Sequence, residues 1–107
     1  MDIQELRREA QTMQPQLTAD RRRLHRNPEA GAVLPETVAY VKERLTEMGY
    51  HPQELGGGLT ATVTGTDTGR CILLRADMDA LRGQEQSGLS FRSENGCMHA
   101  CGHDMHT

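Results

Sequence analysis

The spacing of apolar residues changes near the middle of this chain, and the change limits the folds that the chain can adopt. Over residues 3–48, apolar side chains recur at steps of three and four, which is typical of amphipathic helices. Over residues 50–76, they alternate with polar residues or form short continuous runs, which is typical of strands. The chain is therefore predicted to begin with two helices and to continue with a β region.

Prolines and glycines set the ends of the two predicted helices. Pro15 lies inside the first pattern, and an interior proline loses a backbone hydrogen bond and clashes with the preceding turn, so a kink or short break is expected there. Asn27 precedes Pro28 and should end this helix, because a residue before proline avoids the helical conformation. Pro35 suits the first turn of the second helix, and Gly49 suits the position after its end. The predicted buried face of the second helix consists of Val38, Val41, Leu45 and Met48.

Three segments between residues 50 and 76 have strand patterns. Residues 50–55 are predicted to form a short strand, and the alternating LTATVTG (59–65) a half-buried one. After a predicted turn at TDTG (66–69), the continuous run CILLRA (71–76) is typical of a strand inside a sheet, with Cys71 as a buried thiol.

Residues 77–107 show little periodicity and are rich in Gly, Ser, Asp and His. A loop of this length without regular structure is usually functional or disordered. It begins where the predicted buried strand ends, and open α/β sheets bind ligands at that end. A functional site is therefore predicted in this segment.

The composition excludes several classes of function. The chain has 107 residues, 36% of them apolar, which suits one small domain or a piece of a larger fold. Its net charge of −3 gives no support to a nucleic-acid partner, and the basic run Arg21–Arg23 is interpreted as the solvated face of a helix. No apolar run approaches the roughly 20 residues of a membrane span. The polar N-terminus does not resemble a signal peptide, so a cytoplasmic location without a membrane partner is expected.

Two carboxylates, Asp77 and Asp79, follow the predicted buried strand. A spacing of two places both on one side of an extended chain. Such a pair can bind a metal, orient its ligands or share a proton. The alternative is a polar strand end, because aspartate is common in turns.

The last eleven residues concentrate groups that bind metals: Cys97, His99, Cys101, His103 and His106. Cys101 and His103 could converge in a tight turn, since Gly102 permits unusual backbone angles. On a helix, His99 would instead pair with His103, or His103 with His106. Asp104 suits a hydrogen bond that orients an imidazole. Spacing does not choose among these sets, nor does it exclude a compact metal clip.

Three further polar residues are interpreted as structural. His25 could cap the end of the first helix or act together with Glu29, and Glu85 could be a loop charge. The three cysteines, odd in number, do not predict a disulfide framework.

The ordered strings LHRNPE (24–29), LLRADMDAL (73–81) and GCMHACGHDMHT (96–107) resemble a known family. It is the family of metal-dependent amidohydrolases related to aminoacylases and zinc metallopeptidases. Hippurate hydrolase, N-acyl-L-amino-acid amidohydrolase, indole-acetyl-amino-acid hydrolase and N-acetyl-diaminopimelate deacetylase belong to it. The resemblance runs from about Leu17 to Thr107.

The resemblance implies a fold and a domain organisation. Residues 1–107 would be the N-terminal part of a zinc-exopeptidase-like α/β/α catalytic domain. The rest of that domain, and the small inserted domain that often serves dimerisation in complete and oligomeric members, would be absent.

The resemblance also implies a site. Cys101 and His103 occupy metal-ligand positions, Asp79 matches the aspartate that supports the site, and Asp77 stands where distant relatives carry a histidine ligand. Two divalent metals (Zn, Mn, Co or Ni) would activate water for hydrolysis of N-acyl amino acids. His25, Pro28 and Glu29 match a structural motif of the family.

The implied site is incomplete in these 107 residues. The general-base glutamate and the remaining ligands are expected beyond Thr107, so this chain alone should be inactive and poorly stable. Two other hypotheses stay open: a stand-alone metal-binding module that uses Cys97, Cys101, His103 and His99, and a non-catalytic remnant. A departure from the family pattern at Leu81–Glu85, which lacks the usual proline, should loosen the adjacent loop.

Overall fold

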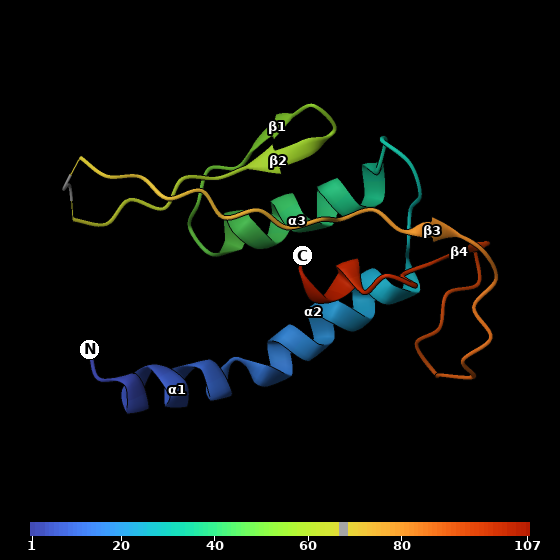
Figure 1. Ribbon diagram of the computed structural model, residues 1–107, viewed down its shortest axis with the longest axis horizontal. Helices are drawn as coiled ribbons and strands as arrows, with labels where there is room; N and C mark the ends of the chain where they lie inside the picture. Colours follow the sequence, from blue (N-terminus) through green and yellow to red (C-terminus); the bar gives the residue numbers. More distant parts are fainter. Residues whose placement is uncertain (67–68) are drawn as a thin grey trace.

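The computed structural model describes residues 1–66 and 69–107, and the chain within them forms three helices, two small hairpins and one 3-10 turn. The elements, in chain order, are α1 (Ile3–Thr12), α2 (Gln14–Arg26), α3 (Pro35–Glu47), β1 (Gln53–Leu55), β2 (Gly58–Thr60), β3 (Leu81–Arg82), β4 (Cys97–Met98) and η1 (His103–Met105). Figure 1 shows α1 and α2 running in series, with α3 beside α2 and the C-terminal turn η1 against α2. The predicted α/β class is confirmed.

The break in the first helical pattern lies where Pro15 predicted it. Met13 separates α1 from α2, and Pro15 occupies the first turn of α2, where its missing N–H costs no hydrogen bond. Helix α2 ends at Arg26, directly before Asn27, as expected from Pro28.

Helix α3 begins at Pro35, as predicted, and its first turn is capped by a residue far outside the helix. The carboxylate of Glu29 accepts the backbone N–H groups of Glu36 (3.2 Å) and Thr37 (2.6 Å). Its negative charge therefore lies at the positive end of the helix dipole. The interpretation that pairs Glu29 with His25 is wrong.

The C-terminus of α3 depends on Gly49. This glycine has φ of 89°, and its N–H bonds to the carbonyl of Thr46 while that of Tyr50 bonds to Leu45. These two bonds form a Schellman motif, whose left-handed position favours glycine. The predicted buried face of α3 is buried only in part. Val38, Val41 and Leu45 are half-buried, but Met48 is exposed.

Helices α2 and α3 are joined through one carboxylate. Asp20 accepts hydrogen bonds from the Tyr40 hydroxyl (2.6 Å) and from Nε of Arg44 (3.1 Å). Burial, together with the hydrogen bond and charge of Asp20, raises the pKa of Tyr40 to about 12. Tyr40 therefore stays protonated and donates throughout the neutral pH range.

The first hairpin confirms the short strand expected within residues 50–55. Strands β1 and β2 are antiparallel and joined by Gly56 and Gly57, whose φ angles of 58° and 86° suit a tight turn of this kind. Of the predicted strand 59–65, only Leu59 and Thr60 are paired. The predicted turn at 66–69 includes residues 67 and 68, which lie outside the described residues.

The predicted buried strand at 71–76 is wrong. This segment is extended, but no described residue pairs with it, and Ile72, Leu73 and Leu74 are 85–90% exposed. Cys71, predicted to be buried, is exposed as well. The physical reason is that a strand becomes buried only when neighbours cover it, and none does so within the described part of the chain.

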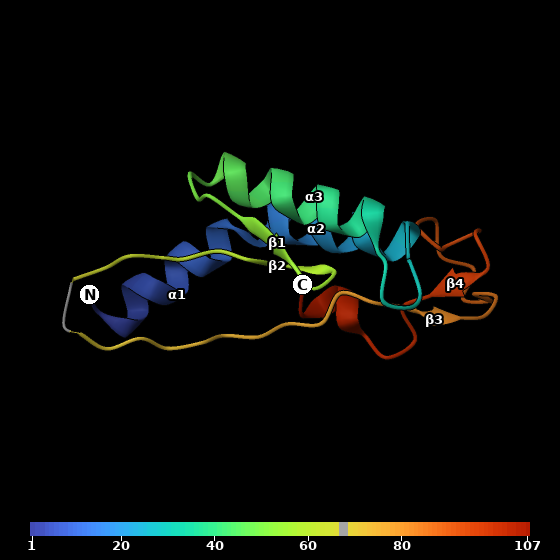
Figure 2. The same cartoon turned by 90° about the horizontal axis from the view of Figure 1, so that it is seen from above.

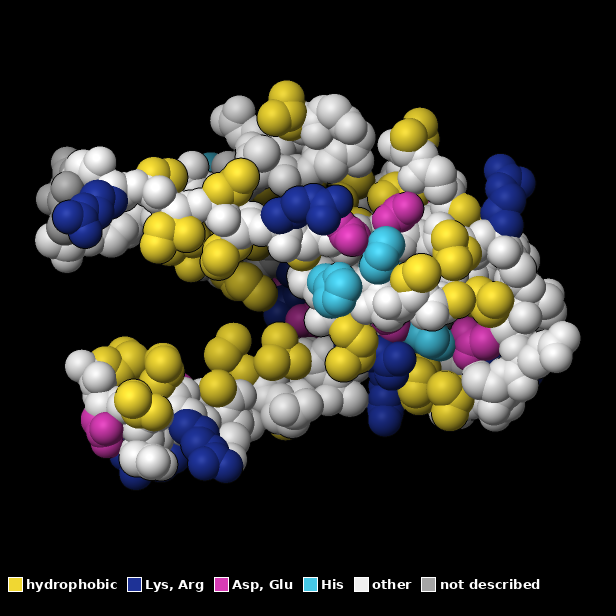
Figure 3. Space-filling model, in the orientation of Figure 1, with side chains coloured by type: hydrophobic (Ala, Val, Ile, Leu, Met, Phe, Trp, Pro, Cys, Tyr) yellow, Lys and Arg dark blue, Asp and Glu magenta, His cyan; other side chains and the backbone are white. Residues whose placement is uncertain are grey.

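The chain is elongated rather than tightly packed. Its radius of gyration is 15.7 Å, above the ~13 Å of a compact domain of this length. Figure 2 shows the extended segments on either side of residues 67–68 as a long limb that runs beyond the end of α3, in the same direction as α1. In Figure 3, apolar side chains are visible on this limb and on α1, with an open notch between the two.

Buried residues gather instead around the C-terminal turn. The buried apolar side chains include Leu24, Leu34 and Ala80, and the buried polar residues include His25, Ser93, His99 and Asp104. A parallel bridge between Ala30 and Ala80, with Ala80 N–H bonded to the Glu29 carbonyl at 2.7 Å, fixes the chain directly after Asp79. None of the helices in the described residues has the length and apolar character needed to cross a membrane.

Candidate metal centre

The structure brings His103 onto the two aspartates that follow the extended limb. Nδ1 of His103 lies 2.9 Å from the Asp79 carbonyl and 2.9 Å from its carboxylate Oδ1. Both partners are acceptors, so Nδ1 carries the proton. Nε2 of His103 lies on the other side of the ring, 3.5 Å from Oδ2 of Asp77. The neutral imidazole therefore directs a lone pair from Nε2 towards Asp77, which is the form that binds a metal.

The same contacts shift the ionisation of His103. Partial desolvation lowers the pKa of His103, but the hydrogen bonds to Asp79 and the charges of Asp77 and Asp79 outweigh it and raise the pKa above its usual value. A metal that binds Nε2 must therefore displace a proton that the two carboxylates hold.

The backbone at residues 101–107 forms a tight turn rather than an α-helix. Gly102 adopts the left-handed conformation (φ 79°, ψ 23°), and η1 follows it directly. The Thr107 hydroxyl closes the turn by donating to the carbonyls of Asp77 (2.7 Å) and His103 (2.9 Å). Cys101 is exposed at the start of this turn. The segment is therefore the tight turn assumed for a pairing of Cys101 with His103, and not the α-helix assumed for the histidine pairs.

The other potential ligands of this segment are placed differently. His99 is buried, and neither of its ring nitrogens has a hydrogen-bond partner among the described residues. Burial lowers the pKa of His99, so its neutral form is favoured. The ring of His106 lies 5.8 Å from that of His103. Within the described residues, no group of three or more His, Cys, Asp or Glu side chains is arranged to hold a metal. A compact four-residue clip is therefore not formed here.

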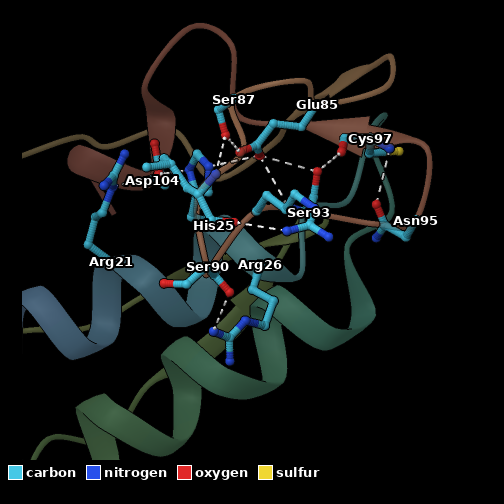
Figure 4. A network of polar contacts seen from close by, with 12 residues as sticks. Arg21, His25, Arg26, Glu85, Ser87, Ser90, Ser93, Asn95, Cys97 and Asp104 are labelled. Carbon is cyan, nitrogen blue, oxygen red and sulfur yellow. Dashed lines mark hydrogen bonds and ion pairs between the residues drawn. The ribbon is translucent and has the colours of Figure 1, made fainter.

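A buried polar network lies between this turn and α2 (Figure 4). We call it the His25 network, and its members are Arg21, His25, Glu85 and Asp104. Oδ2 of Asp104 is 2.9 Å from Nε of Arg21 and 2.7 Å from Nδ1 of His25. On the opposite side of the ring, Nε2 of His25 lies 2.8 Å from Oε1 of Glu85. The imidazole thus separates two carboxylates that are almost fully buried.

These contacts correct two interpretations and modify a third. His25 does not cap a helix, and Glu85, although it lies in a loop, is a buried partner of His25 and not a free charge. Asp104 does orient an imidazole, as expected, but it is that of His25. The sequence offered no signal for the network, because His25 lies 60 positions before Glu85 and 79 positions before Asp104.

Glu85 also organises the loop between β3 and β4. Its carboxylate accepts the Ser87 hydroxyl (2.5 Å) and the Ser93 backbone N–H (3.1 Å). Burial alone would raise the pKa of Glu85, but these hydrogen bonds and nearby His25 lower it to about 2. The loop that lacks the family proline is therefore held by polar contacts of Glu85.

The aromatic ring of Phe91 fixes the same loop against α2. The guanidinium groups of Arg21 and Arg22 lie 5.4 Å and 4.8 Å from its centroid, and the ring of His25 meets its edge at 5.4 Å. The sequence suggested that the basic run 21–23 faces solvent. Arg21 and Arg22 instead pack against this loop.

The turn and the carboxylate that orients His103, together with the exposed thiol of Cys101, agree with the class of protein that the sequence resembles, the metal-dependent hydrolases. The model of the family described as "Peptidase family M20/M25/M40" matches residues 73–107, which include all four predicted site residues.

Relatives of known name support the same relationship. The chain is 44% identical over 99 residues to an N-acetyl-L-cysteine deacetylase of Bacillus subtilis, covering 90% of this chain and 24% of the relative. It is 38% identical over 112 residues to an N-acyl-L-amino acid amidohydrolase of Geobacillus stearothermophilus, covering 100% of this chain and 30% of the relative.

A solved structure agrees in fold. The crystal structure of a Bacillus subtilis protein, described as a dinuclear metal-binding peptidase of the M20 family, superposes with a TM-score of 0.82 at 38% identity. The match covers 88% of this chain and 28% of that protein. The family resemblance is thus confirmed: the chain is related to the M20 amidohydrolases and metallopeptidases. It spans between about a quarter and three tenths of the length of these relatives.

Proposed function

We propose that this chain provides one part of a two-metal amidohydrolase site, with Cys101 and His103 as ligands of a divalent metal. Asp79 holds the ring of His103, and Asp77 supports the metal from the open side of that ring. The observation that carries the proposal is the double contact of Asp79 with Nδ1, which leaves Nε2 of His103 pointing towards Asp77. An orienting carboxylate of this kind is typical of metal-bound histidines.

The donor set fits a metal of the zinc group. Thiolate and imidazole suit Zn, Co and Ni, while added carboxylates also admit Mn. When bound, a pair of such ions supplies Lewis acidity and a water activated at neutral pH. The chain's own residues would hold the ligands: Cys101 and His103 flank the left-handed Gly102, and Asp79 keeps the proton of His103 on Nδ1.

The proposed substrates are N-acyl amino acids, including those of the hippurate type. Hydrolysis of their amide bond gives a carboxylic acid and a free amino acid. The support comes from relatives named as a deacetylase and an amidohydrolase. We propose that the reaction takes place in the cytoplasm and is catalysed by a homo-oligomer of a longer family member. Neither nucleic acid nor a membrane is a proposed partner.

By itself, the 107-residue polypeptide should be inactive. The described residues assemble no third metal ligand, and a hydrolytic site also requires a base and a cleft that excludes water. The chain would then be the N-terminal portion of a catalytic domain. Incubation with hippurate and N-acetyl amino acids in the presence of Zn, Mn, Co or Ni should give no free amino acid; turnover would contradict this part of the proposal.

Cobalt titration of the wild-type chain and of Cys101→Ala tests the ligand assignment. Cobalt bound through Cys101 should give a near-ultraviolet thiolate-to-metal band, which Cys101→Ala abolishes while the affinity falls at least about tenfold.

Cys71→Ala is the matched control, because Cys71 is also an exposed thiol but lies on the extended limb. This variant should keep both the absorption band and the affinity of the wild type. Equal binding by Cys101→Ala and Cys71→Ala would show that Cys101 is not a ligand.

A further inference from the structure

Asp104 connects the proposed metal site to the protein interior. It follows His103 directly in η1, and its side chain is 0% exposed. Its carboxylate faces α2 and binds Arg21 and His25, whereas the neighbouring side chain of His103 faces Asp77 and Asp79. His103 and Asp104 are consecutive in one short turn. They are therefore held by groups on opposite sides of that turn.

This double attachment determines the direction of the His103 ring. The preceding residue is Gly102, with φ of 79°. Because glycine has no Cβ, the backbone before the turn has few intrinsic restraints. The contacts of His103 with Asp79 and of Thr107 with the Asp77 carbonyl hold the turn on one side. The contacts of Asp104 with Arg21 and His25 hold it on the side of α2 and limit its rotation about the first set.

His25 is placed to maintain the second attachment. Its ring lies between Asp104 and Glu85, and its edge-to-face contact with Phe91 limits its rotation. Glu85 in turn is held by Ser93 and Ser87 on the β3–β4 loop. Because a metal ligand must keep its direction to within tens of degrees, such a chain of contacts affects binding without touching the metal.

We propose that His25 is a positioning residue of the metal site: it fixes Asp104, and through Asp104 the orientation of the His103 ring. The metal-affinity part of this inference rests on the proposed function, but the orientation of His103 does not.

The primary experiment needs no metal. Long-range 1H–15N spectra of the wild-type chain, recorded with neutral imidazoles, should show His103 as a single Nδ1–H tautomer. His25→Leu removes both ring nitrogens and should give a mixture of tautomers for His103. His25→Asn retains an amide donor at the place of Nδ1 and should restore the wild-type signal.

Asp20→Asn is the control for a general loss of stability. It lies on the same helix and weakens the contacts with Tyr40 and Arg44, but it does not touch the His25 network. Its His103 signals should match the wild type. If His25→Leu fails to fold, Arg21→Gln, which removes the other donor to Asp104, should produce the same tautomer mixture to a lesser degree.

Cobalt titration then links orientation to binding. His25→Leu should weaken cobalt binding about tenfold, and His25→Asn should recover most of the loss. Unchanged His103 signals in His25→Leu, or equal changes in Asp20→Asn, would overturn the inference. If the His103 tautomers change among the variants as described but the wild-type chain binds no cobalt, the proposed function is refuted. The positioning role of His25 is then retained.

Discussion

At the scale of single residues, folding lowers the pKa of Glu85. This carboxylate is nearly covered, yet hydrogen bonds and His25 hold its pKa at about 2, against 4.5 for an unperturbed glutamate. A group whose pKa is depressed by folding stabilises the native state above the unfolded pKa. That contribution is lost as the pH falls.

The expected result is a loss of stability between about pH 4.5 and pH 2. Urea unfolding followed by circular dichroism at a series of pH values measures it. Glu85→Gln should be less stable than the wild type near neutral pH. Its free energy of unfolding should also depend less on pH between pH 4.5 and pH 2. Glu54→Gln is the control, because Glu54 is 60% exposed and pairs only with Lys42 in an exposed ion pair. Equal pH profiles for Glu85→Gln and the wild type would contradict the prediction.

At the scale of secondary-structure elements, the helices follow local sequence rules, and the first turn of α3 is an exception. The break at Pro15 and the Schellman end at Gly49 require only the residues of the helix itself. The first turn of α3 instead takes its cap from Glu29, six positions before Pro35. Leu34, which occupies the N-cap position, has no side-chain oxygen to offer.

Glu29→Gln should therefore destabilise the chain by about 1 kcal/mol, because the charge at the helix dipole is lost and one amide oxygen replaces two carboxylate oxygens. The change in urea midpoint measures this effect. Glu43→Gln, in the exposed middle of the same helix, should change stability by less than about 0.5 kcal/mol. The cap would be unimportant if the two variants were equally stable.

A second prediction at this scale concerns the end of α3. Gly49→Ala places a Cβ in the left-handed conformation and should cost about 1 kcal/mol. Nothing lies within 4 Å of an added Cβ at this position, so strain rather than a clash would be the cause. A variant as stable as the wild type would show that the Schellman motif does not form in solution.

At the scale of the whole molecule, the exposed apolar limb is the main liability. Ile72, Leu73 and Leu74 are consecutive, extended, and without a pairing strand among the described residues. A row of unpaired backbone groups with apolar side chains favours association. The same residues carry the strand pattern that the sequence indicated for a sheet interior.

We expect the wild-type chain to self-associate with increasing concentration. Light scattering after size-exclusion chromatography should show a larger mean mass for the wild type than for Leu73→Lys. Arg70→Lys is the control, because it keeps the charge near the limb and should behave as the wild type. Monomeric wild-type protein at all concentrations would refute the expectation.

The sequence by itself determined the local elements and the segment that holds the site. Helix periodicity, the prolines and Gly49 specified α1, α2 and α3, because the interactions concerned lie within a few residues of each other. The ligand-rich string at 97–106 marked the turn on which Cys101 and His103 lie. The relation to the M20 family followed from the same strings.

Only the tertiary structure decided which groups meet. Asp79 reaches His103 across 24 positions, Glu29 caps a helix that it does not belong to, and His25 meets Glu85 and Asp104 across 60 and 79. It also decided that residues 71–76 are exposed, although their pattern predicts burial. The reason is common to all four cases: burial and pairing depend on what lies alongside in space, and periodicity records only which side of an element is apolar.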